Sequence, residues 1–212
     1  MADDSPPDDS AQEAPPASFF TREDESADEH FYQQPRFVEH IDQSTIDALT
    51  EYYRKVLRPG IDVLDLMSSW VSHLPEDLNL GRVSGLGMNG AELEANPRLS
   101  DWRVQNLNTT PELEAREAYD AVLCTVSIQY LVKPVEVMRA VHNTLRPLGT
   151  VHISMSHRCF PTKAIAAFQQ LGPKERVQLV SYYLEEAGFD EVEFLDRSPD
   201  VGDPLWILTG RK

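Results

Sequence analysis

The chain has 212 residues, of which 35 are acidic and 19 are Lys or Arg, so its formal net charge is −16 at pH 7. Hydrophobic residues make up 41% of it and no apolar run is long enough to span a bilayer, so we expect one soluble, well-packed domain with no membrane partner. This acidic balance argues against nucleic acid as a partner, because phosphate backbones are bound by clustered Lys and Arg.

The two cysteines, Cys124 and Cys159, form neither a metal-binding spacing nor a disulfide framework, so the sequence predicts free thiols and no metal site. The N-terminus has neither the basic and apolar parts of a secretion signal nor the Arg-rich character of a transit peptide. We therefore expect a cytoplasmic location, with nuclear entry left open.

Residues 1–28 are rich in Pro, Asp, Glu, Ser and Ala, and ordering them costs more entropy than their packing returns. Ten of the acidic residues lie before residue 31, where Arg22 is the only Lys or Arg. The sequence therefore predicts a disordered acidic tail over residues 1–28 and one domain over residues 29–212. Phe19 and Phe20 leave two interpretations open, because they either dock on the domain or are exposed.

The first predicted helix begins at Ser44, a good N-cap, and ends at Pro59 and Gly60. Apolar residues three and four positions apart give it one buried face: Ile46, Leu49, Tyr52, Tyr53 and Val56. Apolar runs then predict strands over residues 61–66, 82–86, 102–104, 119–126 and 149–155. Later helices are predicted from Pro134 onward and over residues 163–170 and 174–187, before closing strands over 192–195 and 205–209. Apolar strands that alternate with helices indicate a parallel sheet covered on both faces, and the two closing strands indicate an antiparallel pair at its edge.

Ligands of such sheets bind outside the carboxyl ends of the strands. Polar or small residues follow the apolar runs at residues 65–70, 87–89, 105–108, 125–130 and 154–163. Residues 63–74 have the outline of a strand, a nucleotide-binding turn and a helix. We therefore expect the binding site at this edge of the sheet.

Four segments occur in the order and approximate spacing of one family: Val-Leu-Asp-Leu at 63–66, Val-Ser-Gly-Leu-Gly-Met-Asn at 83–89, Tyr-Asp-Ala-Val-Leu-Cys at 119–124 and Leu-Arg-Pro-Leu-Gly at 145–149. They resemble class I S-adenosyl-L-methionine (SAM)-dependent methyltransferases of the small-molecule "type 11" kind, whose later motif reads F-D-x-V followed by L-x-P-G-G. The resemblance covers roughly residues 45–155. It implies a single-domain α/β fold with a Rossmann-like, doubly wound, mostly parallel sheet and a C-terminal antiparallel strand pair. It also implies SAM as the cofactor and a small-molecule substrate as methyl acceptor.

The glycines of the first motif are missing. The family reads D-x-G-x-G-x-G, and here Asp65 is kept while the three glycine positions hold Met67, Ser69 and Val71. In the family, these glycines let the backbone approach the methionine part of SAM, and some of them adopt a positive φ. The acid that receives the ribose hydroxyls falls on Gly87, with Asn89 two residues later.

Carried over residue by residue, the resemblance implies cofactor contacts from Asp65, Met67, Ser68, Ser69, Gly87, Asn89, Asn106, Leu107 and Thr125. Asp65 either binds the SAM amino group through water or only caps the next helix. Asn106 stands where the family has an Asp that contacts adenine, and it is either its amide counterpart or a plain loop residue. Loss of the ribose carboxylate removes hydrogen bonds worth about 1.5–3 kcal/mol each, which Ser68, Ser69, Asn89 or Glu92 would have to replace.

His157 and Arg158 are the candidate catalytic residues. A His that titrates near neutrality can take a proton from the acceptor, and an Arg can hold a substrate carboxylate bidentately. The other interpretation places both in a solvated loop. Tyr32, Arg36 and His40 precede the first helix, where small-molecule methyltransferases often have a lid. Trp70 is either a packing residue or a stacking platform.

The leading hypothesis is SAM-dependent methyl transfer to an unidentified small molecule by in-line displacement, with the oligomeric state left open. The rival hypothesis is a non-catalytic protein of the same fold that serves as a binding or scaffolding partner. Another nucleotide as ligand has no support, because the sequence has no G-x-G-x-x-G or phosphate-binding loop.

Overall fold

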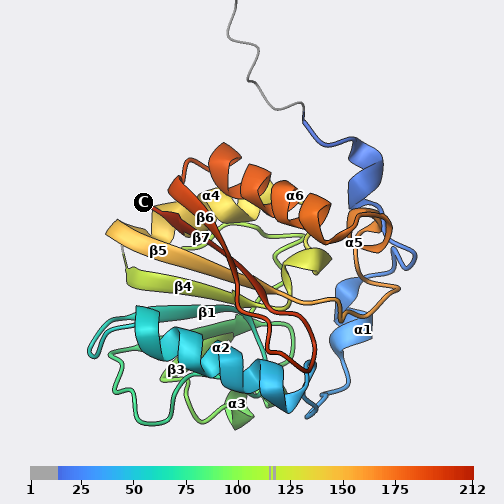
Figure 1. Ribbon diagram of the computed structural model, residues 1–212. Coiled ribbons are helices and arrows are strands. Elements are labelled where there is room, and N and C mark those ends of the chain that lie inside the picture. The colour runs from blue at the N-terminus through green and yellow to red at the C-terminus, as the bar shows by residue number, and fades with distance from the viewer. Residues whose placement is uncertain (1–13, 115, 117) are drawn as a thin grey trace, which may run out of the picture.

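The computed structural model describes residues 14–212 apart from 115 and 117. Its centre is a seven-stranded sheet in the order β3-β2-β1-β4-β5-β7-β6 (Figure 1). The strands are β1 (Val63–Ser68), β2 (Val83–Gly87), β3 (Asp101–Val104), β4 (Tyr119–Thr125), β5 (Leu145–Met155), β6 (Asp190–Asp196) and β7 (Trp206–Arg211). The α-helices are α1 (Asp28–Tyr32), α2 (Gln43–Val56), α3 (Gly90–Ala95), α4 (Pro134–Thr144), α5 (Ala166–Gln170) and α6 (Pro173–Glu186), with 3-10 helices η1 (Ala17–Phe20) and η2 (Ile128–Tyr130).

The strand directions confirm the predicted doubly wound α/β domain. Strands β1 to β5 run parallel, and β7 is antiparallel to both β5 and β6. Chain order reverses between β1 and β4, which are adjacent in the sheet. Such a switch point opens a crevice at the carboxyl ends of the two strands, where ligands of this architecture bind.

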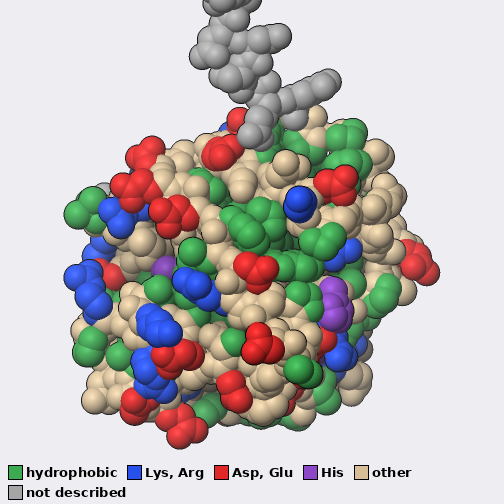
Figure 2. All heavy atoms as spheres, viewed as in Figure 1, with side chains coloured by type: hydrophobic (Ala, Val, Ile, Leu, Met, Phe, Trp, Pro, Cys, Tyr) green, Lys and Arg blue, Asp and Glu red, His purple; other side chains and the backbone are tan. Residues whose placement is uncertain are grey.

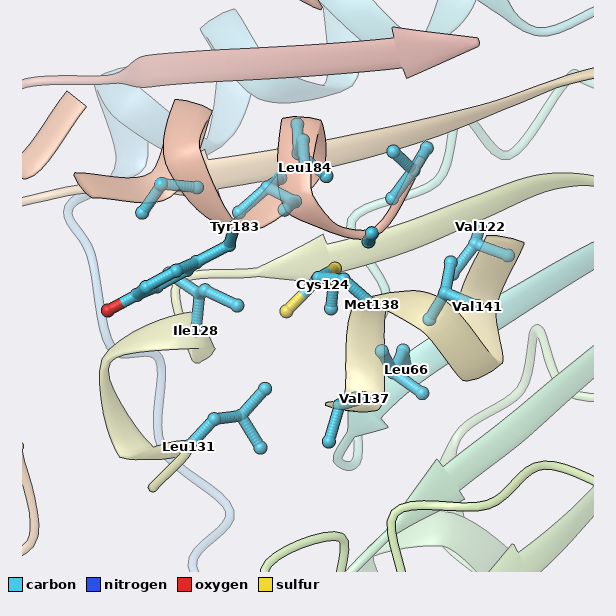
Figure 3. Close-up of a cluster of buried hydrophobic side chains, with 14 of the residues drawn as sticks. Leu66, Val122, Cys124, Ile128, Leu131, Val137, Met138, Val141, Tyr183 and Leu184 are labelled. Carbon is cyan, nitrogen blue, oxygen red and sulfur yellow. The ribbon is translucent and has the colours of Figure 1, made fainter. Parts of the chain in front are cut away.

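Alternating residues of the central strands bury their side chains on opposite faces of the sheet, as the period of two requires. In β4, Val122 and Cys124 face a core made with α4 and α6, while Ala121 and Leu123 face a second core under α2. Figure 3 shows part of the first core, where Met138 of α4 and Tyr183 and Leu184 of α6 surround the end of β4. Packing on both faces holds the central strands in place, and therefore also the crevice at the carboxyl ends of β1 and β4.

Helix α2 (Gln43–Val56) has its N-cap two residues earlier than the sequence predicted, at Asp42 rather than Ser44. The Asp42 carboxylate accepts the backbone N–H of Thr45 at 3.0 Å, and the Ser44 hydroxyl donates to the same carboxylate at 2.7 Å. An Asp at the N-cap satisfies a free N–H and favours the positive end of the helix dipole. The helix ends at Val56, before Leu57 turns into extended backbone.

The N-terminal segment, residues 14–41, lies against the domain (Figure 1). Phe19 and Phe20 pack against the core of α4 and α6, and Arg22 forms an isolated bridge with Ile165. The sequence placed the start of the domain at residue 29, whereas residues as early as Phe19 pack against its core in the structure. Aromatic burial and the ion pairs of Arg22 and Lys163 supply the stabilisation that composition alone did not reveal. The disorder predicted for residues 1–13 concerns residues outside the described part of the chain.

Charged side chains of both signs lie on the face of the molecule drawn in Figure 2. On the face shown in Figure 2, Lys and Arg side chains alternate with Asp and Glu side chains rather than gathering into one broad region. Of the helices that the structure describes, none combines the length and the apolar character that a membrane crossing requires.

Candidate functional site

A cavity of about 310 Å³ lies at the carboxyl ends of β1, β2 and β4, under the N-terminal segment. Its volume is at the lower end of the range of about 300–1,000 Å³ typical of small-molecule sites. All nine residues predicted to contact the cofactor line this cavity: Asp65, Met67, Ser68, Ser69, Gly87, Asn89, Asn106, Leu107 and Thr125. The sheet therefore brings together side chains up to 60 positions apart in the sequence. Their contact with a cofactor stays a prediction.

Asp65 is a buried carboxylate at the centre of β1. It accepts hydrogen bonds from the hydroxyls of Ser68 and Ser72, both at 2.6 Å, and Asn96 donates to Ser72 at 2.8 Å. Burial raises the pKa of Asp65 to about 6. Among the ion pairs of the described residues, none includes Asp65. A buried carboxylate without a cation is suited to binding a cationic ligand group.

The helix expected after the first motif is absent, because residues 69–82 form a loop. Only six residues separate Ser68 from Pro75, and Trp70, Val71 and Ser72 among them are weak helix formers. Asp65 therefore does not cap a following helix, and the interpretation of it as a cap was wrong. We call residues 67–73 the first-motif loop.

The glycine positions of the first motif are filled, but one of them keeps the conformation that glycine would adopt. Met67 has φ +58° and forms a bulge that shifts the register between Leu66 and Ser68. His73 and Val126, at φ +53° and +42°, also line the cavity. Positive φ costs a residue with a side chain about 1–3 kcal/mol. Such strain commonly gathers at functional sites, because the surrounding structure must impose it.

Gly87 has no room for the acid of the family. A Cβ at this position would lie 2.2 Å from the backbone oxygen of Ser68, because the Met67 bulge places Ser68 directly beside Gly87. A side chain at position 87 would require β1 or β2 to move. The glycine in the second motif and the side chains in the first are therefore parts of one packing arrangement.

Two of the residues predicted to contact the cofactor form hydrogen bonds with the N-terminal segment. Asn89 caps α3 through its Oδ1, and its Nδ2 donates to the backbone oxygen of Tyr32 at 2.9 Å. Asn106 donates to the Glu29 carboxylate of α1 at 2.9 Å, and its Oδ1 accepts the backbone N–H of Asn108 at 3.0 Å. The amide oxygen predicted to receive adenine thus already has one donor, and a carbonyl oxygen can accept a second.

The other residues predicted to contact the cofactor differ in whether their side chains already have hydrogen-bond partners within the protein. Leu107 is buried and offers the cavity an apolar surface. The hydroxyl of Thr125 lies 2.8 Å from the hydroxyl of Tyr53, so it belongs to a polar pair under α2. Ser69 donates to Glu92 at 2.6 Å.

The predicted catalytic pair lies at the rim rather than at the centre. His157 Nε2 is 3.1 Å from one oxygen of Asp203, and Arg158 Nε is 2.8 Å from the other. Arg158 lines the cavity, whereas His157 does not. Asp203 is buried and also accepts the backbone N–H of Asp42 at 3.0 Å, so it fixes this loop to the start of α2. The sequence indicated only a turn at Asp203 and Pro204, because nothing in it places this carboxylate beside residues 45 and 46 positions away.

Tyr32, Arg36 and His40, the residues predicted as a lid, all line the cavity. The Arg36 guanidinium lies 4.4 Å from the ring centre of Phe31, and His40 meets the ring of Phe160 edge to face at 5.2 Å. Burial lowers the pKa of His40, which leaves its imidazole neutral near pH 7. The lining of the cavity thus includes aromatic rings and an imidazole in addition to Asp65.

His73 and Phe160 are among the lining residues to which the sequence analysis gave no role. Glu92, which the sequence named only as one of four possible replacements for the ribose carboxylate, also lines the cavity and is a buried acid five positions after Gly87. His73 and Phe160 carry no comparable signal in one sequence. Trp70 also lines the cavity, and its indole N–H donates to the backbone oxygen of Val38 at 3.1 Å.

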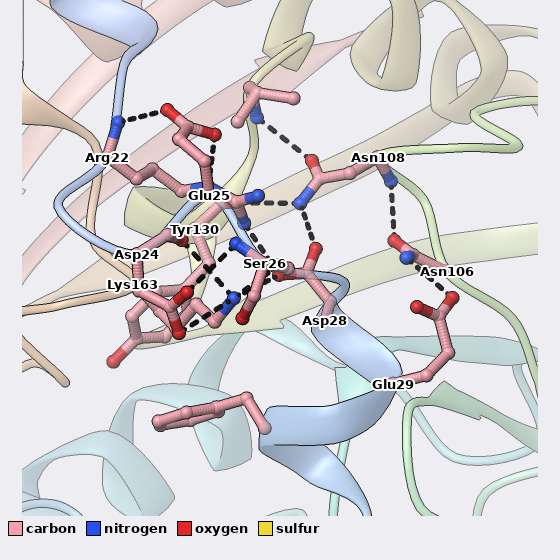
Figure 4. A network of polar contacts seen from close by, with 12 residues as sticks. Arg22, Asp24, Glu25, Ser26, Asp28, Glu29, Asn106, Asn108, Tyr130 and Lys163 are labelled. Atoms are coloured by element: carbon pink, nitrogen blue, oxygen red, sulfur yellow. Dashed lines mark hydrogen bonds and ion pairs between the residues drawn. The ribbon is translucent and has the colours of Figure 1, made fainter.

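A buried ion cluster holds the N-terminal segment over the cavity (Figure 4). Lys163 is fully buried, and its Nζ lies 3.2 Å from carboxylate oxygens of both Asp24 and Asp28 and 2.7 Å from the backbone oxygen of Ser26. Asp28 also pairs with Arg22 at 2.7 Å and accepts a hydrogen bond from Asn108 at 2.9 Å. Asp28 itself lines the cavity, so the cluster joins the cavity lining to Asn108 in the loop after β3.

The sequence matches no family model and no curated protein. Several solved structures share its fold. A SAM-dependent methyltransferase from Mesorhizobium loti has 16% identity and a TM-score of 0.56, over 79% of this chain and all of that one. Phosphoethanolamine N-methyltransferase 2 from Haemonchus contortus, solved with SAM, has 14% identity and a TM-score of 0.57, over 78% of this chain and 52% of that one.

A third similar structure is the (4+2)-cyclase SpnF, with 16% identity and a TM-score of 0.60 over 78% of this chain and 81% of that one. Its name shows that the same architecture is found with a different chemistry, as expected when function depends on the site rather than on the fold. The strand order, the cavity at the switch point and these similarities agree. The chain has the fold of the class I SAM-dependent methyltransferases.

Proposed function

We propose that the protein binds SAM in the cavity and transfers its methyl group to a small-molecule acceptor. The observation that carries this proposal is the buried Asp65 carboxylate, which lies at the switch point and has no cationic partner among the ion pairs of the described residues. SAM carries an ammonium group and a sulfonium group, and both are favoured next to a buried carboxylate.

The residues present fit the cofactor in charge and in polarity. Glu92 is a second buried carboxylate of the same cavity, and like Asp65 it has no ion pair among those of the described residues. Leu86 and Leu107 give an apolar surface to a planar base, and Tyr32 lies in the same lining. Asp65 would hold the ammonium group, and the backbone of the first-motif loop would lie along the methionine part.

When bound, SAM supplies an electrophilic methyl group, and the protein mainly has to align the acceptor with it. Alignment alone can account for a large part of the rate of such a displacement. Tyr32 and Arg36 of the N-terminal segment line the cavity, so their side chains would lie beside the reacting groups. His40 can take a proton from a hydroxyl or amine acceptor, because its imidazole is neutral and lines the cavity, whereas His157 lies outside it.

Titration calorimetry with SAM and with its product S-adenosylhomocysteine (SAH) tests the proposal without knowledge of the acceptor. We expect saturable binding of both to one site, weakened at least tenfold by Asp65→Ala. Asp200→Ala, which removes an exposed carboxylate from a loop, should leave the affinity unchanged. Equal affinities of the wild type and Asp65→Ala would contradict the assigned site.

A non-catalytic binding protein is the second candidate, because a specific observation favours it. The amide groups of Asn89 and Asn106 already bond to the N-terminal segment, as if that segment occupied part of a nucleoside site. Absence of heat with either SAM or SAH at millimolar concentration would support this candidate and refute methyl transfer.

A further inference from the structure

The second motif leaves the ribose hydroxyls of SAM without the acceptor that the resemblance would place at the end of β2. Position 87 is closed to any side chain, since its Cβ would lie 2.2 Å from the backbone oxygen of Ser68. Asn89 is the next polar residue, and its Oδ1 is held by the backbone N–H groups of Ala91 and Glu92 at 3.0 and 3.2 Å. A replacement acceptor must therefore come from another position of the cavity wall.

Glu92 occupies such a position. It stands in the first turn of α3, the helix that follows β2, and it lines the cavity together with Gly87 and Ser69. Only 8% of Glu92 is exposed, which is unusual for a glutamate. A carboxylate therefore belongs to the same cavity lining as the glycine that replaces the acid of the family.

Two fixed donors orient the Glu92 carboxylate and leave it unsaturated. Oε1 accepts the backbone N–H of Arg36 at 2.7 Å, and Oε2 accepts the hydroxyl of Ser69 at 2.6 Å. Each carboxylate oxygen has two lone pairs, so each can accept one more hydrogen bond. No cation is paired with it among the ion pairs of the described residues, and burial of an unpaired carboxylate is costly unless further donors approach it.

We propose that the Glu92 carboxylate accepts the ribose hydroxyls of SAM, in place of the acid that position 87 cannot hold. This inference rests on the proposed function, because it assumes that SAM binds in the cavity. The carboxylate has moved from the end of the strand to the next helix, and the serine in the second glycine position of the first motif now orients it. The three departures at Met67, Ser69 and Gly87 then form one rearranged ribose site.

The same contacts have a simpler explanation that the experiment must exclude. Glu92 joins the N-terminal segment, through Arg36, to the first-motif loop, through Ser69, and this link alone could account for its burial. A purely structural link would affect every ligand of the cavity alike. A ribose acceptor affects only ligands that carry the hydroxyls.

The experiment compares SAH with its 2′,3′-dideoxy analogue by titration calorimetry. The wild type should bind SAH at least tenfold more tightly than the analogue. Glu92→Gln should weaken SAH binding about ten- to a hundredfold, as expected for loss of hydrogen bonds to a charged group, and should leave the affinity for the analogue unchanged. Glu94→Gln, an exposed acid on the same helix, should change neither affinity.

Equal loss for both ligands in Glu92→Gln would overturn the proposal and leave the structural link. Equal affinity of the wild type for SAH and the analogue would overturn it as well, and this result does not depend on the folding of any variant. If the wild type binds neither ligand, the proposed function fails together with this inference. Binding of SAH without discrimination refutes the role of Glu92 alone.

Discussion

Replacement of Lys163 by Met should release the N-terminal segment and destabilise the domain. The Lys163 side chain is completely buried, and its ammonium group lies 3.2 Å from oxygens of Asp24 and Asp28. Removal of one member of a buried ion pair costs about 3–5 kcal/mol, because it leaves the other charge unpaired. Asp28 keeps its ion pair with Arg22 and its hydrogen bond from Asn108, so we expect the low end of that range, about 3 kcal/mol.

For a domain of this size, about 1 kcal/mol lowers the Tm by about 2–4 °C, so the expected decrease is about 6–12 °C by calorimetry. Met fills much of the volume of Lys, so the change removes mainly the charge and its hydrogen bonds. Lys174→Met, at an exposed position of α6, serves as the matched control and should stay within about 0.5 kcal/mol of the wild type. The N-terminal segment should also become more sensitive to protease in Lys163→Met. A decrease of less than about 2 °C, or one equal to that of the control, would refute the role of the ion cluster.

Gly87→Ala should lower the free energy of unfolding by about 3 kcal/mol, because the new Cβ would clash with the backbone oxygen of Ser68. Gly90→Ala is the control and should be neutral or stabilising, since its Cβ would find no atom closer than 3.6 Å. Equal midpoints of the two variants in urea unfolding would contradict the conclusion that position 87 has no room for a side chain. Burial raises the pKa of Asp65 from 3.8 to about 6, so its protonation stabilises the folded state fully below pH 4 and this contribution is lost as the pH rises through 6. Asp65→Asn should abolish that decrease and raise stability at pH 7 by about 1–3 kcal/mol while weakening SAH binding, and a destabilised variant would show that the assigned pKa is wrong. Burial lowers the pKa of His152 to about 4, so its neutral form stabilises the fold above pH 6.5 and this contribution is lost as the pH falls through 4. In His152→Gln, the free energy of unfolding measured in urea should therefore decrease less between pH 7 and pH 4 than in the wild type. The same decrease in both proteins would refute this role of His152.

The sheet was predictable because its signals are local. Val122 and Leu123 belong to a continuous apolar run, and such runs between helices require a parallel sheet covered on both faces. The short strand at Asp101–Val104 and the antiparallel pair of β6 and β7 also followed from pattern and chain order. The edge at which a ligand would bind followed from the sheet, so all nine predicted cofactor residues line one cavity.

The missed features depend on contacts between distant parts of the chain. Lys163 and Asp28 lie 135 positions apart, and neither has a local pattern that marks it as buried. The same holds for Asp203, which the sequence indicated only as part of a turn. Gly87 was noticed as the loss of an acid, but its cause is the bulge at Met67, which no sequence rule predicts.

The central claim is that the cavity at the carboxyl ends of β1, β2 and β4 holds SAM. A crystal structure of the protein with SAH tests it most directly. We expect electron density for SAH inside the cavity, with its amino group at Asp65 and its ribose at Glu92. Density for SAH outside the cavity, or none in crystals saturated with millimolar SAH, would contradict the claim.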